Sequence, residues 1–238
     1  MLGVDPNLFE AQLTRRLYFC SLGIGFVFTC MYAYFQLQGD SIVDFCELNR
    51  DTFPIEVMNT VSMFPWICLS LVLFFKSIRQ EKHLWTITAY GISLWISVGS
   101  ACLHSTLTRF SEGMDELPMY YLTLHGIFGL LLPIKTRQSL VLFLTFSLFI
   151  LINYCSYVEY NHFLIPYSCL VGIFLALFLK LPWTKLSLLS LVCLFIGYLC
   201  WINDFYNCHP THYYHAIWHL MIMVSIHLWI QHIDQAFS

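Results

Sequence analysis

The chain has 238 residues, of which 58% are hydrophobic and 11% are charged, whereas an ordinary soluble domain has roughly 25% charged residues. This shortage of charge excludes a water-facing globular surface. The formal net charge of −3 gives no support for nucleic-acid binding. A chain of this composition divides into membrane spans of about 20 apolar residues each rather than into soluble domains.

Eight apolar runs follow one another along the chain, and each is long enough to cross a bilayer with some tilt. They lie near residues 17–37, 55–75, 84–103, 116–134, 138–155, 162–180, 185–201 and 214–231. The first run follows Arg15 and Arg16, but it is longer than a signal-peptide core of about 7–15 residues and lacks a small-residue cleavage site. The sequence therefore predicts one all-α integral membrane domain, residues 1–238, in which 1–37 form an extra N-terminal span and 38–238 form a seven-helix transmembrane bundle.

The positions of lysine and arginine predict the orientation of these spans. With the N-terminus in the cytoplasm, nine of the eleven basic residues fall on the cytoplasmic side, and only Arg50 and Arg109 fall on the other. This bias predicts that both termini are cytoplasmic, and it supports eight spans independently. It also brings three polar segments to the non-cytoplasmic side: 38–54, 104–115 and 202–214.

Two pairs of residues at helical spacing are candidates for a metal site. His215 and His219 are four residues apart, so both imidazoles lie on one face of a helix; such a pair also arises by chance, but ionisable groups inside a span are costly and usually functional. Ser100 and His104 have the same spacing where the third span ends, on the side where the last span begins. Three histidines with one open position are typical of a catalytic zinc site, whereas His104 taken alone would favour a packed core histidine.

An acidic segment follows this third span. One helix continuous through the third and fourth runs would be too long for a bilayer, so the chain must turn between His104 and Asp115. Gly113 allows that turn, and Pro118 suits the first turn of a new helix. We expect Asp115 to point inward and hold a zinc-bound water, and Glu116 to complement the positive helix N-terminus.

A second acidic segment lies between the first two spans. Asp44, Glu47 and Asn49 offer hard oxygen ligands, which suit calcium rather than zinc. A solvated loop is the alternative for this segment. Glu56 favours the calcium interpretation, because a carboxylate that enters a span needs a partner.

These clusters, in this order, resemble the alkaline ceramidase family of integral membrane hydrolases, in a superfamily that includes the adiponectin and progestin receptors. The similarity runs from about residue 44 to 231, and its matching stretches are 44–49, 56–62, 99–107, 115–119 and 215–219. The serine–histidine segment, followed after eleven residues by Asp-Glu-Leu-Pro-Met, is its most specific part.

The resemblance implies that His104, His215 and His219 bind zinc. It also implies that Asp115 contacts the zinc-bound water and that Ser100 supports the reacting carbonyl. In this interpretation Asp115 is the general base, and Ser100 stabilises the developing oxyanion.

The resemblance also implies a calcium ion held by Asp44, the backbone carbonyl of Phe45, Glu47, Asn49 and Glu56. Phe45 stands where the family usually has tryptophan, which matters little if only its carbonyl binds. The stretch between Asn49 and Glu56 is shorter than is usual in the family.

A disulfide between Cys46 and Cys208 is a further implication of the resemblance. The predicted topology places both cysteines on the oxidising side of the membrane, which permits the bond. Most of the other cysteines lie in apolar runs, where a thiol acts as a small hydrophobic group.

The expected function is zinc-dependent hydrolysis of the amide bond of ceramide-like lipids, which gives a sphingoid base and a fatty acid. The lipid substrate would enter from the bilayer, and no nucleic acid or obligatory protein partner is expected. We expect the endoplasmic reticulum or Golgi membrane in a eukaryote, or the inner membrane in a bacterium, with the active site towards the non-cytoplasmic side.

Two other functions stay open at this point. One is a receptor of the same superfamily whose metal site is mainly structural, and retention of the acidic calcium motif argues against it. The other is a transporter that uses the histidines as a metal or proton path. Transporters often show repeated halves with broken spans, and the sequence shows no such repeat.

Overall fold

The computed structural model describes residues 26–43, 47, 53–131, 137–207 and 213–237, and the regular elements in these ranges are all helices. Residues 26–36 are helical, and seven further helices follow. They are α2 (Val57–Arg79), α3 (Leu84–Thr106), α4 (Arg109–Leu131), α5 (Arg137–Tyr154), α6 (Asn161–Phe178), α7 (Lys185–Tyr206) and α8 (Tyr214–Phe237).

Five of these helices are long and apolar enough to cross a bilayer, namely α2, α3, α6, α7 and α8. In α4, the predicted fourth span, four charged residues fall within the first eight positions. The prediction of an all-helical membrane protein is confirmed. The count of eight spans and the cytoplasmic position of both termini stay predictions.

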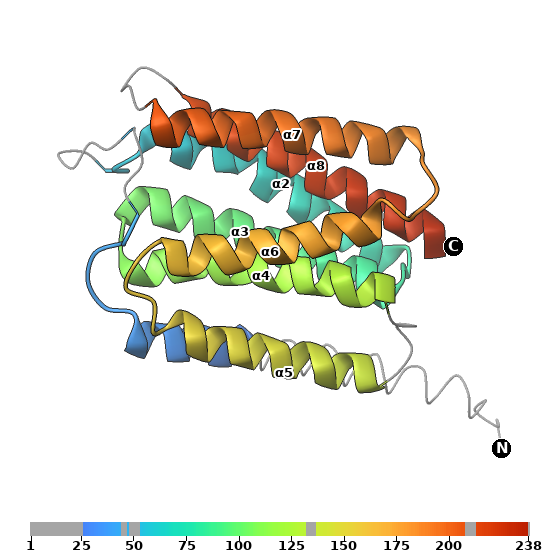
Figure 1. Ribbon diagram of the computed structural model, residues 1–238, viewed down its shortest axis with the longest axis horizontal. Coiled ribbons are helices and arrows are strands. Elements are labelled where there is room, and N and C mark those ends of the chain that lie inside the picture. The colour runs from blue at the N-terminus through green and yellow to red at the C-terminus, as the bar shows by residue number, and fades with distance from the viewer. Residues whose placement is uncertain (1–25, 44–46, 48–52, 132–136, 208–212, 238) are drawn as a thin grey trace.

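The helices lie roughly side by side and alternate in direction, so their connections gather at two ends of the bundle (Figure 1). One end, here called the α3–α4 end, holds the α3–α4 and α5–α6 connections and the start of α8. The opposite end, here called the basic end, holds the α2–α3 and α6–α7 connections and carries Lys76, Arg79, Lys82, Lys180 and Lys185. Basic residues thus gather at one end of the bundle, as the positive-inside pattern requires of a cytoplasmic face.

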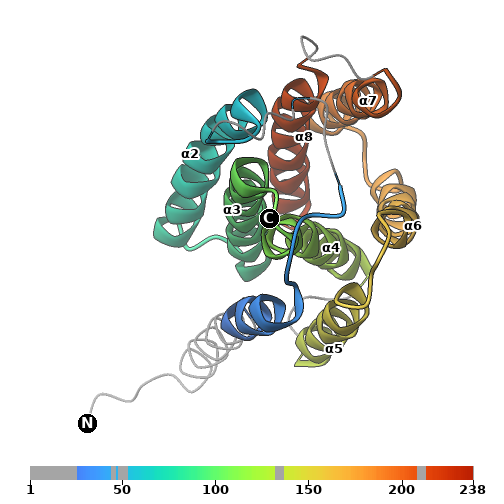
Figure 2. The same ribbon diagram turned by 90° about the vertical axis from the view of Figure 1, so that its left-hand side faces the viewer.

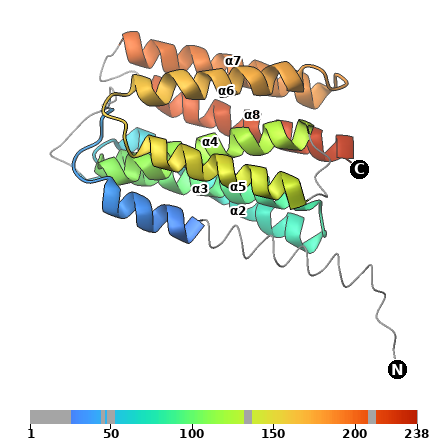
Figure 3. The same ribbon diagram turned by 60° about the horizontal axis from the view of Figure 1, so that its bottom comes forward.

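Helix α3 lies inside the bundle, where it contacts α2, α4 and α8 (Figure 2). Residues 26–36 lie at the edge of the bundle beside α5 and far from α7, which suits a span added to a seven-helix core (Figures 2 and 3). Small residues and polar side chains let α3 pack closely: Ser93 accepts a hydrogen bond of 2.9 Å from Trp66 Nε1 and lies 3.1 Å from Ser70. Such residues are the usual means of helix association in a membrane, because lipid is as apolar as leucine.

The turn between α3 and α4 lies earlier than the sequence suggested. Leu107 ends α3 in the left-handed region with φ of 45°, and α4 begins at Arg109. Thr108 and Ser111 satisfy the first backbone groups of α4, because the backbone N–H of each lies 3.1–3.2 Å from the hydroxyl of the other; this reciprocal arrangement is a capping box.

The predicted turn between His104 and Asp115 is confirmed, but the roles predicted for Gly113 and Pro118 are wrong, because both residues lie inside α4. The expectation that Glu116 complements the helix N-terminus is wrong for the same reason. Glu116 lies seven residues after Arg109, beyond the first turn in which the helix dipole acts. The pair Thr108 and Ser111, spaced as a helix cap, was the sequence feature that could have predicted where α4 begins.

Candidate metal centre and substrate cavity

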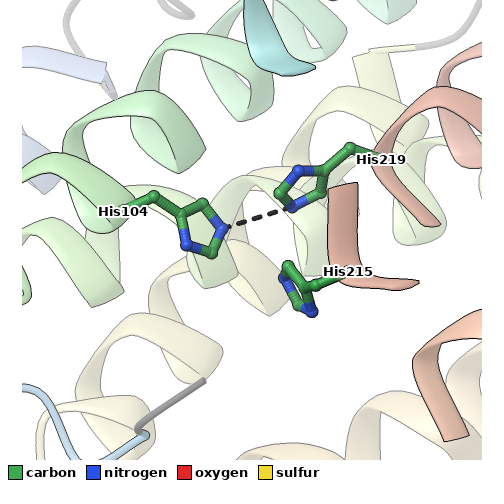
Figure 4. Close-up of side chains that lie close together, drawn as sticks. All are labelled: His104, His215 and His219. Carbon is green, nitrogen blue, oxygen red and sulfur yellow. Dashed lines mark hydrogen bonds between the residues drawn. The ribbon is translucent and has the colours of Figure 1, made fainter. Parts of the chain in front are cut away.

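Three histidine side chains converge where α3 ends and α8 begins (Figure 4). His104 comes from the last turn of α3, and His215 and His219 come from the first two turns of α8. One ring nitrogen from each lies within 4.8 Å of the others, and the side chains are 0%, 5% and 4% exposed. The structure thus brings His104 to a pair of histidines that lie more than 100 positions later in the sequence.

The spacing of one pair of these nitrogens fits tetrahedral zinc coordination. The Nε2 atoms of His104 and His219 lie 3.2 Å apart. Two nitrogens bound at about 2.0–2.1 Å in a tetrahedral site lie about 3.3 Å from each other. Three imidazole nitrogens also suit zinc or another transition metal, and they do not suit calcium or magnesium, which prefer oxygen.

Hydrogen bonds on the far side of the rings fix the orientation of two histidines. His104 Nδ1 lies 2.5 Å from Glu56 Oε2, and His219 Nδ1 lies 2.8 Å from Ser62 Oγ. The Ser62 hydroxyl donates its own hydrogen to the carbonyl of Asn59 at 2.7 Å, so it accepts from His219. The Nε2 lone pair of His219 is consequently left for a metal ion.

His215 has a carboxylate behind it as well. Its Nδ1 lies 3.5 Å from Asp204 Oδ2, and both side chains are 6% exposed. Asp204 stands in the last turn of α7, so this contact joins α7 to α8 beside the metal ligands. A carboxylate or hydroxyl beside the second nitrogen of a metal-binding histidine is usual, and it raises the basicity of the ring.

Sequence reasoning missed Ser62 and Asp204. Ser62 lies in the second turn of α2, six residues after Glu56, and only its place in the family-like stretch 56–62 could have distinguished it. Asp204 carried a clearer signal, since it ends an apolar run on the side of the membrane where His215 begins the next helix.

Two carboxylates of the predicted calcium set have other partners in the structure. Glu47 accepts hydrogen bonds of 2.5 Å and 2.7 Å from the backbone N–H groups of Met58 and Asn59, at the start of α2. Glu56 contacts His104 as described, and it accepts a hydrogen bond of 3.2 Å from Asn59 Nδ2. Glu56 is 0% exposed, which explains why it needed a partner.

The other residues of the calcium and disulfide predictions, Asp44, Phe45, Asn49, Cys46 and Cys208, lie outside the described residues.

Ser100 and Asp115 meet where α3 and α4 approach most closely. Ser100 lies one turn before His104 and is 2% exposed, and its side chain interacts with the Asp115 carboxylate. Gly99 makes this approach possible, because a Cβ atom there would overlap the backbone carbonyl of Met114. Pro118 has no N–H to donate to that carbonyl, so the carbonyl is free of the usual helical hydrogen bond and faces α3.

A cavity of about 600 Å³ opens beside these residues and continues towards the basic end. Its polar groups at the α3–α4 end include Ser100, Asp115, Glu116, His215 and His219. Farther along it is mainly apolar, with walls from α4, α6, α7 and α8 that include Phe174, Phe178, Leu191, Ile222 and Trp229. An apolar cleft of this size with convergent polar groups at one end suits an amphipathic ligand with a long chain.

The fold and the site together define a helical membrane protein with a three-histidine site inside the membrane region and an apolar cavity beside it. Residues 37–236 match the ceramidase family, and the chain belongs to that family. It is 27% identical over 218 aligned positions to alkaline ceramidase 3 of Mus musculus, covering 80% of this chain and 81% of the relative. It is 21% identical over 201 positions to an alkaline ceramidase of Arabidopsis thaliana, covering 76% and 78%.

Membership of this family confirms the resemblance found in the sequence motifs, and it confirms the prediction of a hydrolase that acts on a linear amide C–N bond. It favours the hydrolase over the receptor and the transporter.

Proposed function

We propose that this protein hydrolyses the amide bond of ceramide-like lipids within the membrane and releases a sphingoid base and a fatty acid. The observation that carries the proposal is the convergence of three buried imidazoles at the polar end of a long apolar cavity. The two relatives named as alkaline ceramidases support the choice of substrate.

His104, His215 and His219 are the proposed ligands of a zinc ion, and they leave a fourth position open. Zinc in such a site supplies a Lewis acid and lowers the pKa of bound water towards about 7. Glu56, Ser62 and Asp204 hold the rings in place, as judged from their contacts with the Nδ1 atoms.

Asp115 is proposed as the general base and then the general acid. It takes a proton from the attacking water as the water oxygen bonds to the amide carbon. It returns that proton to the amine nitrogen as the C–N bond breaks, so the products are a carboxylic acid and an amine. Its position beside Ser100 on the cavity wall supports this role, and such proton transfer contributes about 10²- to 10⁴-fold in rate.

Ser100 is proposed to donate a hydrogen bond to the carbonyl oxygen as that oxygen gains negative charge. A donor placed in this way contributes about 3 kcal/mol in comparable sites. Ser100 lies one turn from His104 on α3, so the carbonyl oxygen would lie between the hydroxyl and the histidine cluster.

Several finer features stay proposals. They are eight spans with both termini in the cytoplasm, a site facing the non-cytoplasmic side, and residence in the endoplasmic reticulum or Golgi membrane of a eukaryote or the inner membrane of a bacterium. The Cys46–Cys208 disulfide and a calcium ion bound by Asp44, Phe45, Glu47, Asn49 and Glu56 are proposed on family resemblance. Calcium binding there requires Glu56 to share its carboxylate with His104.

The test compares wild-type protein with His219→Ala after purification in detergent, by metal content and by hydrolysis of a fluorescent ceramide. We expect zinc in the wild type, and loss of both zinc and activity in the variant. The loss should exceed about 100-fold, since removing even an outer partner of a metal ligand costs about 10- to 100-fold.

His227→Ala is the matched control. His227 lies two turns farther along α8, is equally buried, and contacts Ser70 rather than the histidine cluster. It should keep its zinc. Unchanged turnover in His219→Ala, or equal loss of zinc in both variants, would defeat the proposal.

A further inference from the structure

Glu116 is a buried carboxylate on the cavity wall that the hydrolytic chemistry leaves without a role. It follows Asp115 directly in α4, is 4% exposed and lines the cavity. Among the described residues its one hydrogen-bond donor is Tyr154, whose hydroxyl lies 2.6 Å from Glu116 Oε2. An ionised carboxylate can accept about four hydrogen bonds, so Glu116 has capacity for further donors.

The nearest cation to Glu116 forms its ion pair with another carboxylate. Arg109 forms an ion pair of 2.8 Å with Glu112 Oε2, and Glu112 is absent from the cavity wall. Arg109 is linked to Glu116 by Tyr154, to whose hydroxyl it donates at 3.2 Å, and its charge also acts on Glu116 without a direct ion pair among the described residues. The guanidinium is therefore used by Glu112, while Tyr154 holds one oxygen of Glu116 in place.

A buried carboxylate with few donors is costly unless a ligand completes its hydrogen bonds. Glu116 lines the cavity, so a molecule within the cavity can supply further hydrogen bonds to it. An acceptor in this position selects a ligand that brings O–H or N–H groups, and a purely hydrocarbon chain brings none.

We propose that Glu116 binds the hydroxyl groups of the sphingoid base and so selects hydroxylated amides over simple N-alkyl amides. This inference rests on the proposed hydrolysis of ceramide-like lipids. In ceramide the two hydroxyl-bearing carbons flank the carbon that carries the amide nitrogen. A substrate whose amide lies at Ser100 and Asp115 consequently has its hydroxyls within reach of the next residue of α4.

The Tyr154 contact makes Glu116 a fixed acceptor rather than a mobile one. Tyr154 is 0% exposed, and its ring lies under the Arg109 guanidinium at 4.9 Å. A preorganised acceptor loses little conformational freedom when substrate binds. It therefore discriminates more sharply between ligands with and without hydroxyls.

The experiment measures kcat/KM for three amides with the same acyl chain: ceramide, 1-deoxyceramide and 3-deoxyceramide. The wild type should prefer ceramide to at least one deoxy analogue by about 10- to 100-fold, the range of a hydrogen bond to a charged group. Glu116→Leu should lower kcat/KM for ceramide to the level of that analogue, while kcat/KM for the analogue and the zinc content stay close to wild type.

Thr123→Val is the matched control, because Thr123 lies two turns farther along α4, on the same face, and lines the same cavity. It should keep the preference. Glu116→Gln keeps the side-chain volume and serves as the test if Glu116→Leu does not fold. It should reduce the preference for ceramide over the deoxy analogue several-fold, because a neutral acceptor binds about half as strongly as a charged one.

Equal loss on all three amides, or an unchanged preference in Glu116→Gln, would overturn the inference. A wild type that cleaves all three amides equally well would overturn it while leaving the proposed function intact. A wild type that cleaves none of them would remove the proposed function and this inference together.

Discussion

Two polar clusters lie at the α3–α4 end of the bundle and are stabilised in different ways. The histidine cluster joins α3 and α8 and consists of His104, His215, His219 and their partners Glu56, Ser62 and Asp204. The arginine cluster joins α4 and α5 and consists of Arg109, Glu112, Glu116 and Tyr154. Both are buried, so neither can rely on water to stabilise its charges.

The difference between the clusters lies in the source of positive charge. The arginine cluster contains its own cation, and the Arg109–Glu112 ion pair forms within one helix. In the histidine cluster the Nε2 atoms of His104 and His219 lie 3.2 Å apart while acceptors stand behind the rings, an arrangement that suits a metal ion supplied from outside the chain. The first arrangement is suited to stability and substrate recognition, and the second to holding a reactive metal.

The largest expected effect comes from removing the internal cation. Arg109→Met leaves Glu112 as an uncompensated buried charge, which typically destabilises a protein by about 3–5 kcal/mol. Thermal unfolding in detergent should show a large fall in Tm. A fall that appears only in zinc-loaded protein would contradict the view that the arginine cluster is stabilised by its own cation.

The next prediction concerns the point where the clusters meet. Gly99→Ala places a methyl group against the Met114 carbonyl and pushes α4, with Asp115, away from α3. A shift of about 1 Å can cost about 100-fold in rate, so kcat should fall about 100-fold while zinc stays bound.

The matched control for Gly99→Ala is Gly91→Ala, two turns earlier in α3. A Cβ atom there lies 3.3 Å from the Phe74 ring, which can move aside. Ceramide hydrolysis and zinc content are measured on both variants. Equal activity in the two would show that the close approach at Gly99 does not position Asp115.

A smaller effect is expected from the acceptor behind a metal ligand. Glu56→Gln keeps an oxygen for His104 Nδ1 but removes its charge, so zinc affinity should fall about 10- to 100-fold. Competition with a chelator measures the affinity. Ser62→Ala removes a neutral partner and should cost less; the opposite order would contradict the role given to the Glu56 carboxylate.

The smallest expected effect is the change in stability on removing an exposed ion pair at the basic end. Lys82 Nζ forms an ion pair of 2.9 Å with Asp234, but its side chain is 39% exposed, and Asp234 also accepts a hydrogen bond of 2.6 Å from Thr86. Lys82→Met should change stability by about 0–1 kcal/mol. A fall in Tm as large as that of Arg109→Met would refute the contrast between buried and exposed ion pairs.

The helices and the metal-ligand candidates were predictable because they depend on local pattern. Long apolar runs must be helical in a bilayer, where every backbone group needs an internal hydrogen bond. Histidines four residues apart share a helix face whatever surrounds them. The basic residues then determined that the ends of the third and eighth spans lie on one side, which brought His104 to His215 and His219.

The turn before α4 was not predictable from the residues that usually form turns. Gly113 and Pro118 looked like the ends of helices, but each has a packing role inside α4. Gly113 faces Leu37 and Tyr154 closely, and Pro118 leaves the Met114 carbonyl without a helical donor. Tertiary contacts of this kind override local preference.

The sequence alone therefore determined the helical membrane class, the set of histidines and the family, since each depends on spacing along one chain. Tertiary structure alone decided which acceptor holds each histidine, and it separated Glu116 from the helix terminus and placed it in the cavity. The physical reason is that partners such as Asp204 and His215 come from different helices. Their pairing depends on helix rotation and depth, and neither is encoded in the periodicity of a single span.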